Sequence, residues 1–445
     1  MLANYLTTLI LSFSILVCSA QEISPQSKIF AEDTVQDGIV KTYFEGGKSL
    51  MFKGRVKDGM RQGPWIYYRT DGTVNSIVNY ADDEINGPTI SYDGDEIKVS
   101  ETYFVNGVKE GEHREFYNDG SVALLGYFKE GKRDSTWTEF IGFKKRSFKK
   151  RYKNDQLHGE SVFYFEQEYA FDKVQAVENY QYGVKDGEWK FYFLNKQLEK
   201  QFFFKNGLLD GPYVEYYRNG KKKEEGNFSF DLRSGKWLTF WEEGGLESIG
   251  DYRRDQRTGI WKFFSKSGTL RSEGPYLNDQ RNGQWIYYFE DGALSAVGSY
   301  QYGEKHGMWG LFYSNDQLQQ EQSWSRGRLM EVSEFYTIKG EELESGTLKG
   351  GDGSYFEYYP EGELYIAANL SGGLFEGEYT IYYTSGTKQA RGDMRLGLQH
   401  GNWTYWHNNG KVESTGEFRN GEKVGRWKYY SGRGRLRDTI DHGDL

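Results

Sequence analysis

The sequence has 445 residues with a formal net charge of −9, and it contains 56 glycines, only 6 prolines and 17% aromatic residues. This composition is typical of a turn-rich all-β protein and excludes a chain that is disordered throughout. The net negative charge argues against a nucleic-acid-binding protein, which normally presents a strongly basic surface.

Residues 1–20 carry no charged side chain and hold an apolar stretch that is followed by Cys18-Ser19-Ala20. This pattern predicts a signal peptide that is cleaved after Ala20 and exports the chain to the periplasm, the cell envelope or the exterior. Lipidation of Cys18 is the less favoured alternative, because Val17 is larger than the residue usually found before such a cysteine. A membrane anchor is disfavoured because the stretch is too short to span a bilayer comfortably. Residues 21–37 are expected to form a polar leader, and no cysteine remains after cleavage for a disulfide.

From Gly38 onward the chain repeats one phrase, which is clearest from Gly259 to Asn282. Trp261 and Phe263 alternate with their neighbours at period two, which is typical of a strand. Ser267-Gly268 supplies a turn, and a second extended run then leads to another turn before the phrase starts again. Each unit therefore predicts a β-hairpin.

A glycine opens nearly every unit, and successive opening residues are 24 apart except for a first step of 25 residues from Gly38 to Gly63, a 28-residue step before Gly187 and a 22-residue step before Gly353. Such a period, repeated over about seventeen units, indicates an array in which each unit contacts mainly its neighbours. Ser135 and Glu331 stand in the glycine slot, so we expect the array to be least regular there.

Two aromatic slots recur in each unit. A tryptophan usually stands two residues after the opening glycine, and another aromatic residue usually stands five residues after it. The two slots differ in parity, so an unbulged strand places them on opposite faces of the sheet. We therefore expect aromatic ladders on both faces, and packing is the favoured role for them. Stacking on sugar rings is the alternative.

The pattern Gly-x-Trp-x-x-Tyr-Tyr, Asn/Asp-Gly-x-Leu and Gly-x-Tyr resembles the MORN-repeat variant of bacterial antitoxin-like proteins. The resemblance implies an all-β fold, which we expect to be an elongated, twisted, single-layer antiparallel sheet of about seventeen tandem hairpins. The expected organisation is hairpin repeats over 38–337, an irregular joint over 338–352 that is the weakest part of the sheet, and hairpin repeats over 353–445. The insertion near Phe165–Tyr180 predicts a longer hairpin, with a short helical excursion as the alternative. The resemblance also implies a scaffolding role, and for some members an antitoxin or immunity role.

The residues that could carry chemistry are dispersed along the array. His158, His306 and His400 each precede an opening glycine, where we expect turn residues that share the tolerance of Asn and Asp for positive φ. His158 and His306 are about six units apart, or roughly 60 Å along the sheet, so they cannot share a metal ion. One slot holds a glutamate in four different hairpins, which gives no evident catalytic carboxylate pair; these are Glu115, Glu139, Glu215 and Glu357. We therefore expect no enzyme activity, no cofactor and no metal.

One basic run is a candidate interaction site. It comprises Lys144, Lys145, Arg146, Lys149, Lys150, Arg151 and Lys153. A solvated strand face is the plainer interpretation of such a run. The functional interpretation is a contact with an acidic partner or a phosphorylated lipid headgroup at a membrane surface.

Together these features predict an exported, non-enzymatic repeat scaffold that mediates protein–protein interaction through an unknown protein partner, with an antitoxin-like or immunity-like role as its narrower form. The alternative is a protein that binds glycan or cell-envelope material with its aromatic rows. Nucleic acid is not expected as a partner of an exported, acidic chain.

Overall fold

The structure is a computed structural model that describes residues 36–142, 145–167, 170 and 172–443. Within these ranges the regular secondary structure is entirely β, with no α-helix. It follows that these residues contain no helix of the length and apolarity that a membrane crossing requires. The predicted signal peptide and residues 21–35 of the predicted leader lie outside the described residues.

The chain divides into two compact units, one ending at Lys132 and the other beginning at Arg133. The first unit contains β1 (Gly38–Tyr43), β2 (Leu50–Lys57), β3 (Met60–Tyr68), β4 (Val74–Ala81), β5 (Glu84–Tyr92), β6 (Lys98–Val105), β7 (Val108–Phe116) and β8 (Val122–Lys129). The second contains β9 (Lys132–Ile141, which starts at the last residue of the first unit), β10 (Lys145–Lys153), β11 (Gln156–Leu157), β12 (Gly159–Tyr164), β13 (Val174–Gln181), β14 (Val184–Lys185), β15 (Gly187–Tyr192), β16 (Leu198–Lys205), β17 (Leu208–Leu209), β18 (Gly211–Tyr216), β19 (Lys222–Ser229), β20 (Leu232–Phe240), β21 (Leu246–Arg253), β22 (Gln256–Phe264), β23 (Leu270–Leu277), β24 (Gln280–Arg281), β25 (Gly283–Tyr288), β26 (Leu294–Gln301), β27 (Glu304–Phe312), β28 (Leu318–Ser325), β29 (Arg328–Val332), β30 (Phe335–Tyr336), β31 (Glu342–Leu343), β32 (Gly353–Tyr358), β33 (Leu364–Ser371), β34 (Leu374–Tyr382), β35 (Lys388–Arg395), β36 (Leu398–Trp406), β37 (Val412–Arg419), β38 (Glu422–Tyr430) and β39 (Leu436–Asp441).

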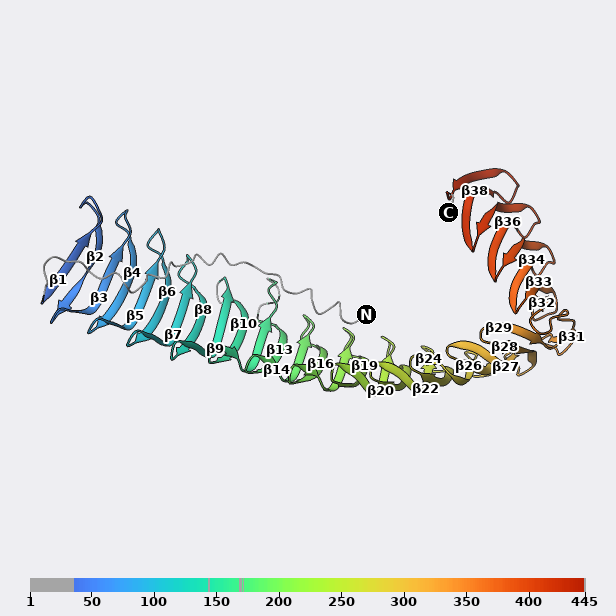
Figure 1. The fold of residues 1–445 in the computed structure, drawn as a ribbon, viewed down its shortest axis with the longest axis horizontal. Helices are drawn as coiled ribbons and strands as arrows, with labels where there is room; N and C mark the ends of the chain where they lie inside the picture. The colour runs from blue at the N-terminus through green and yellow to red at the C-terminus, as the bar shows by residue number, and fades with distance from the viewer. Residues whose placement is uncertain (1–35, 143–144, 168–169, 171, 444–445) are drawn as a thin grey trace. The chain divides into compact units, whose positions relative to one another are not determined.

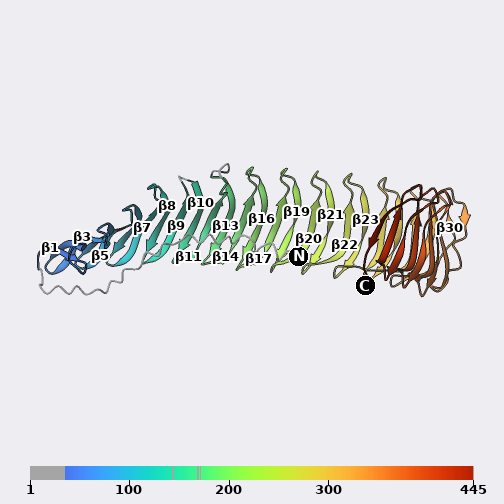
Figure 2. The same ribbon diagram turned by 90° about the horizontal axis from the view of Figure 1, so that it is seen from above.

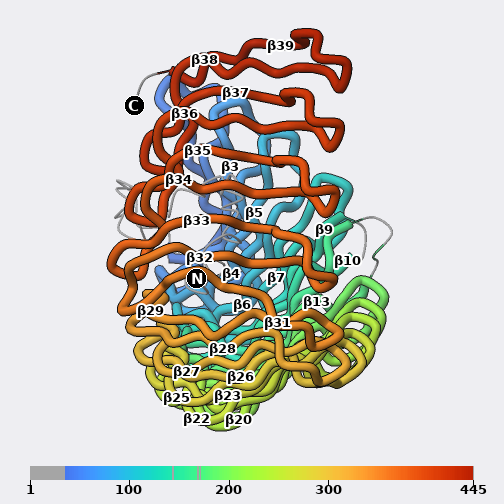
Figure 3. The backbone as a smooth tube through the Cα atoms, turned by 90° about the vertical axis from the view of Figure 1, so that its right-hand side faces the viewer, coloured from blue at the N-terminus to red at the C-terminus, as the bar shows by residue number. Residues whose placement is uncertain are grey.

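These strands belong to a 29-stranded sheet from β1 to β29, a two-stranded sheet of β30 and β31, and an eight-stranded sheet from β32 to β39. Strands that follow one another in the chain pair antiparallel as hairpins (Figures 1 and 2). Figure 3 shows β32 to β39 stacked in chain order. The predicted all-β array of antiparallel hairpins is therefore confirmed.

The hairpin of β22 and β23 shows how one unit is built. Trp261 pairs with Gly274, and Phe263 pairs with Ser272, so these side chains lie on one face of the sheet. Lys262 pairs with Glu273 on the opposite face, where their charged groups are 2.8 Å apart. We call these two surfaces the Trp face and the open face. Because the register repeats from unit to unit, each sequence slot keeps its face along the sheet.

A bulge recurs where each unit joins the next. Between β21 and β22, the register passes from Ile249↔Lys262 to Asp251↔Thr258, so the single residue Gly250 faces three residues on β22. The opening residue of the unit, Gly259, adopts a φ of +64° at this bulge. A positive φ of this kind costs glycine little, which explains why glycine opens most units.

Ser135 stands in the same slot and adopts the same backbone conformation, with a φ of +59°. It pairs with Tyr152, and from there the ladder between β9 and β10 runs without a shift to Glu139↔Phe148. The expectation of local irregularity at Ser135 was therefore wrong, because the fold holds a non-glycine residue in the left-handed conformation rather than changing its path.

The segment predicted to be a weak joint is irregular but well packed. Phe335 and Thr337 are buried just before it, and Ser345 and Leu348 are buried within it. Leu348 joins a core cluster with Leu329 and Tyr355, which belong to strands on either side of the segment. Its packing therefore does not mark this segment as weak.

The insertion before Tyr180 forms a longer hairpin. Strand β12 pairs with β13 from Gly159↔Tyr180 to Tyr164↔Val174. The described residues of the insertion contain no α-helix, and Ala170 lies in a 3-10 turn, where its N–H donates to the Gln167 carbonyl at 2.9 Å. The pairing of β12 with β13 agrees with a longer hairpin, which was the favoured interpretation.

Candidate interaction surface

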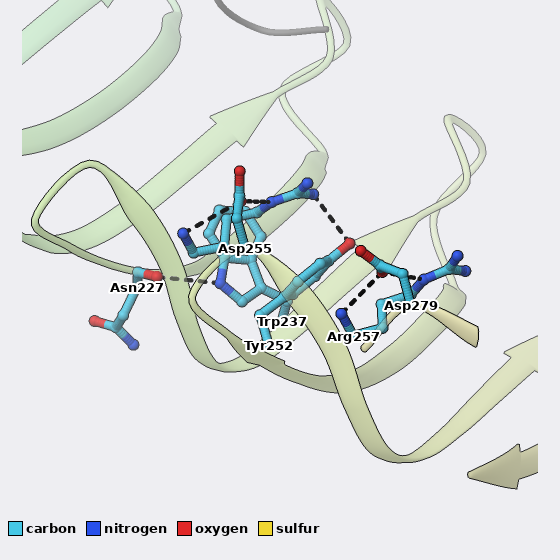
Figure 4. Close-up of polar contacts among 7 residues, drawn as sticks. Asn227, Trp237, Tyr252, Asp255, Arg257 and Asp279 are labelled. Carbon is cyan, nitrogen blue, oxygen red and sulfur yellow. Dashed lines mark hydrogen bonds and ion pairs between the residues drawn. The ribbon is translucent and has the colours of Figure 1, made fainter. Parts of the chain in front are cut away.

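The Trp face is closed by its own side chains. Trp237, for example, lies over Gly226, so that a Cβ on this glycine would stand 2.3 Å from the ring. Its Nε1–H donates to the carbonyl oxygen of Asn227 at 3.1 Å (Figure 4). This carbonyl lies at the bulge, so the indole supplies a hydrogen bond where the strand ladder is interrupted.

The same hydrogen bond, to the residue ten positions earlier at 3.0 to 3.2 Å, is made by Trp65, Trp189, Trp237, Trp261, Trp285, Trp309, Trp403 and Trp427. The tryptophans of this slot are only 0 to 6% exposed. Their rings also contact neighbouring aromatic rings, as Trp285 contacts Tyr276 edge-on at 5.2 Å. The tryptophan row is therefore a packed core and offers no open ring face to a ligand.

Arginine–aspartate pairs join successive turns beside this row. The Arg233 Nε–H donates to Asp255 Oδ1 at 2.8 Å, and its guanidinium lies 4.1 Å from the centre of the Tyr252 ring (Figure 4). Arg257 repeats both contacts with Asp279 and Tyr276 one unit later. The carboxylates of these turns are therefore engaged in ion pairs within the protein.

The Trp face also carries a half-buried carboxylate pair. Glu215 lies directly across the sheet from Glu224. Tyr213 donates its hydroxyl hydrogen to Glu215 at 3.0 Å, and the Lys223 ammonium donates to the other oxygen at 2.9 Å. Burial, and next the charge of Glu215, raise the pKa of Glu224. The slot containing Glu215 was noted in the sequence, but its partner came from a different slot and was missed.

A second charged interruption lies where Ser161 replaces tryptophan. Ser161 is fully buried and pairs with Glu178, while Lys150 occupies the corresponding position opposite Trp137. The Lys150 ammonium lies 3.9 Å from the centre of the Phe148 ring. Burial lowers the pKa of Lys150 and raises the pKa of Glu178. Lys150 and Glu178 therefore stand in the part of the Trp face where Ser161 leaves no tryptophan ring.

The structure does not bring the predicted basic run together on one face. Lys144 lies outside the described residues. Lys145 is buried, and Arg146 forms an ion pair with Asp172 at 2.9 Å. Lys150 lies in the Trp face, whereas Lys149 and Arg151 pair with Thr138 and Thr136 on the open face. Lys153 is exposed beside a turn, 5.7 Å from the centre of the Tyr182 ring.

The open face mixes aliphatic, aromatic and charged side chains. One row crosses it through Gln201, Val214, Glu225, Leu238 and Ile249, each directly opposite the next. All five side chains are half-buried, so this face has no covering layer like the tryptophans.

The second aromatic slot lies on the open face, as its parity predicted. Its rings contact charged groups: the Lys98 ammonium lies 4.6 Å from the Phe116 ring centre, and Tyr288 donates to Glu273 at 3.1 Å. The expected second aromatic ladder therefore lies on the open face, with charged side chains between its rings.

A shallow concavity of about 510 Å³ lies on the open face, over β16, β18, β19 and β20. Phe203, Pro212, Val214, Tyr216 and Leu238 form its apolar lining. Polar side chains stand around these residues, including Lys222, Glu225 and Lys236. The combination of a few aliphatic and aromatic groups with surrounding charges suits a protein side chain or a short peptide segment.

The two aromatic slots on which the sequence prediction rests contain only one residue of this apolar lining, Tyr216, so they do not predict the site. Pro212, Val214 and Leu238 stand one or three residues after their opening glycines, where several other units have charged residues, such as Lys262 and Lys428. A comparison of these two slots across the units would have found the apolar cluster.

The histidines have a different environment from the one predicted. The positive φ falls on the glycine that follows each of them, such as Gly307 at +74°, and not on the histidine. His306 and His400 instead pair with Ser299 and Asp393 in strand ladders. Within the described ranges, no group of three or more His, Cys, Asp or Glu residues could hold a metal ion.

Comparison with known proteins gives one family match. The profile of a family described as MORN repeat variant matches residues 185–206, 209–229, 257–278 and 399–420. No curated protein matches the chain.

Several solved structures are similar to the chain at a low level. Crystal structures of TcdB2-TccC3-TEV and TcdB2-TccC3 match 91% and 92% of it at 11% and 9% identity, with TM-scores of 0.14 and 0.11. A structure of the Photorhabdus luminescens Tc holotoxin pore matches 92% at 10% identity, with a TM-score of 0.12. The chain spans 24 to 32% of the length of these structures, and such TM-scores establish no structural relationship. The family match, in contrast, falls on the hairpins built above: the chain is an array of hairpin repeats, and four stretches of it match the profile of the MORN repeat variant.

Proposed function

We propose that this protein is an exported, non-enzymatic scaffold that binds a protein partner through the open face of its sheet. The difference between the two faces carries the proposal. The Trp face is filled by its own rings, whereas the open face leaves aliphatic side chains half-exposed among charged groups. Interfaces of proteins that associate reversibly have this mixed character, with apolar anchors inside a polar rim.

The concavity around Val214 and Leu238 is the proposed anchor point. Apolar anchors that enter a pocket contribute most of the binding energy at a typical interface. Export follows from the predicted signal peptide, and an antitoxin or immunity role is supported only by the resemblance of the repeats to antitoxin-like proteins.

The proposal is tested by a cross-linked pull-down of residues 21–445 from the envelope fraction of the source cells. Val214→Glu and Leu238→Glu place a carboxylate in the concavity. Ile286→Glu is the matched control, because Ile286 occupies the same slot and the same face farther along the sheet. A discrete protein that the first two variants lose and the control retains would support the proposal.

Two results would overturn it. Recovery of polysaccharide or lipid without a stoichiometric protein would favour the glycan or envelope alternative. A catalytic turnover that disappears on substitution of one carboxylate would contradict a non-enzymatic role. For the antitoxin form, the captured protein should inhibit growth when expressed alone, and co-expression of this chain should restore growth.

A further inference from the structure

Three successive turns of the second unit carry a group of exposed apolar side chains. The turns lie between β13 and β14, β16 and β17, and β19 and β20. Their apolar residues, with exposed fractions, are Tyr182 (46%), Val184 (46%), Leu208 (40%), Phe230 (70%) and Leu232 (38%). We call this group the turn-rim patch.

The three turns abut, so the patch is continuous. The Gly207 N–H donates to the Lys185 carbonyl at 2.8 Å, which ties the second turn to the first. The Asp231 N–H donates to the Leu209 carbonyl at 2.9 Å and ties the third turn to the second. Val184 reaches toward the next turn, because a Cβ on Gly207 would lie 3.5 Å from its Cγ1.

Two members of the patch are held in a costly backbone conformation. Tyr182 and Phe230 occupy the first turn position at φ values of +48° and +51°. Asn206, between them, adopts the same conformation, which asparagine tolerates far better. A large aromatic residue costs about 1–2 kcal/mol more than glycine there. Phe230 is 70% exposed and gains little packing in return, whereas the Tyr182 ring packs against His158 with the ring centres 4.5 Å apart. Strain of this kind often accompanies a functional surface.

The patch has a positive rim. Lys205 pairs with Leu208 on the open face, and Lys153 and Arg253 occupy the equivalent positions in flanking units. All three cations are exposed. The turn carboxylates are used internally: Asp231 accepts from the Leu209 N–H at 2.7 Å, and Asp255 pairs with Arg233.

The spacing of the turns matches an α-helix. Successive turns on one edge are separated by two strands, or about 9.6 Å. Seven residues of an α-helix rise about 10.5 Å, so side chains one heptad apart can contact successive turns. We propose that the turn-rim patch binds an amphipathic helix of the partner protein, with its apolar stripe on the patch and acidic residues beside the stripe. This inference rests on the proposed scaffold function and adds the chemistry of the partner.

The patch adjoins the proposed anchor on the same face. Phe203 of the concavity and Lys205 of the rim alternate along β16, so both side chains point to the open face. A partner whose helix lies along the turns could therefore place a neighbouring segment in the concavity.

The test is a selection of random 16-residue peptides displayed on phage against residues 21–445. We expect peptides with apolar residues at helical spacing and flanking Asp or Glu. In fluorescence anisotropy, the double variant Leu208→Glu/Leu232→Glu should weaken their binding at least tenfold, because it adds negative charge to the site. Raising the salt concentration should also weaken binding, because exposed charges are screened. Ile260→Glu is the control, since Ile260 is 62% exposed on the open face in a later hairpin.

Selected peptides that are basic, that lack helical spacing, or that bind the double variant equally well would overturn the proposal. So would binding to vesicles of phosphatidylcholine and phosphatidylglycerol that the double variant loses, because the patch would then contact lipid. If the double variant keeps the captured protein while Leu238→Glu loses it, the scaffold function stands and the helix site does not.

Discussion

The indole of Trp285 on β25 lies on Gly274 of β23 and donates its Nε1–H to the carbonyl of Pro275 at 3.0 Å. A Cβ on Gly274 would stand 2.4 Å from the ring, so the close contact requires glycine. The same contact places glycine eleven residues before a tryptophan at Gly54, Gly226, Gly250, Gly274, Gly298, Gly392 and Gly416. The glycine and the tryptophan therefore act as one packing unit that spans two hairpins.

Units without this tryptophan also differ at the glycine position. Val78 precedes Thr89, Thr102 precedes His113, Lys150 precedes Ser161 and Phe202 precedes Tyr213, each by eleven residues. Trp189 departs from the rule, with Glu178 in the slot. The size of the side chain eleven residues before the tryptophan slot therefore usually indicates whether the next hairpin can place a tryptophan over it.

Gly274→Ala should lower the free energy of unfolding by about 1–3 kcal/mol, because the added methyl group forces the Trp285 ring out of its packed position. Chemical denaturation followed by tryptophan fluorescence measures this change. Gly432→Ala is the control, since a Cβ there meets only the Asn409 side chain at 3.9 Å. Equal stabilities for the two variants would show that the ring can move aside at no cost.

Much of this fold could be predicted because the sequence of each repeat is sufficient to predict one hairpin. Alternation predicted the strands, and the opening glycines predicted the period. The Gly274–Trp285 contact could not be read in the same way, because it joins residues of different hairpins across a bulge. The bulge shifts the register, so counting along one strand does not reveal which residues of the next strand lie opposite.

Ser135→Gly should raise the free energy of unfolding by up to about 1 kcal/mol, because glycine adopts the required positive φ at a lower cost than serine. Native-state hydrogen exchange of the amides in β9 and β10 measures the local change, which a long array need not report in a global transition. The reverse substitution, Gly259→Ser, should destabilise β22 by a similar amount. A less stable Ser135→Gly variant would contradict the argument.

The candidate site was harder to predict than the fold. The basic residues are close together in the sequence and suggest one patch, but successive side chains of a strand point to opposite faces of the sheet. Lys149 therefore lies on the open face and Lys150 in the core. The open-face concavity and the turn-rim patch are both assembled from several hairpins, so no single stretch of sequence contains either surface.

Lys150 and Lys149 should respond differently to substitution. Lys150→Ser removes the alkyl stem together with the ammonium group that lies over the Phe148 and Phe163 rings, and it should lower the free energy of unfolding by about 1–3 kcal/mol. Lys149→Ser should change it by less than about 0.5 kcal/mol. Lys150→Met keeps most of the apolar packing and should restore stability. If Lys149→Ser proves the more harmful change, the assignment of faces in β10 is wrong.

Glu224→Gln should stabilise the protein at neutral pH. Burial and the nearby charge of Glu215 raise the pKa of Glu224 above its ordinary value of 4.5, so the folded state favours the protonated form. The folded protein therefore loses stability as the pH rises from 4.5 through the raised pKa, because the folded chain resists an ionisation that the unfolded chain permits. Glutamine removes this penalty while it keeps the size of the side chain.

The gain should amount to a few degrees in the melting temperature at pH 7 and should vanish below pH 4.5, where both states of the wild-type protein hold the proton. Thermal melts between pH 3 and pH 8 test this difference. Glu225→Gln is the control on the same strand, because Glu225 points to the open face and pairs with the exposed Lys222. Its removal should bring no stabilisation that grows with pH. A Glu224→Gln variant whose advantage is the same at every pH would place the effect in packing rather than in the charge shared with Glu215.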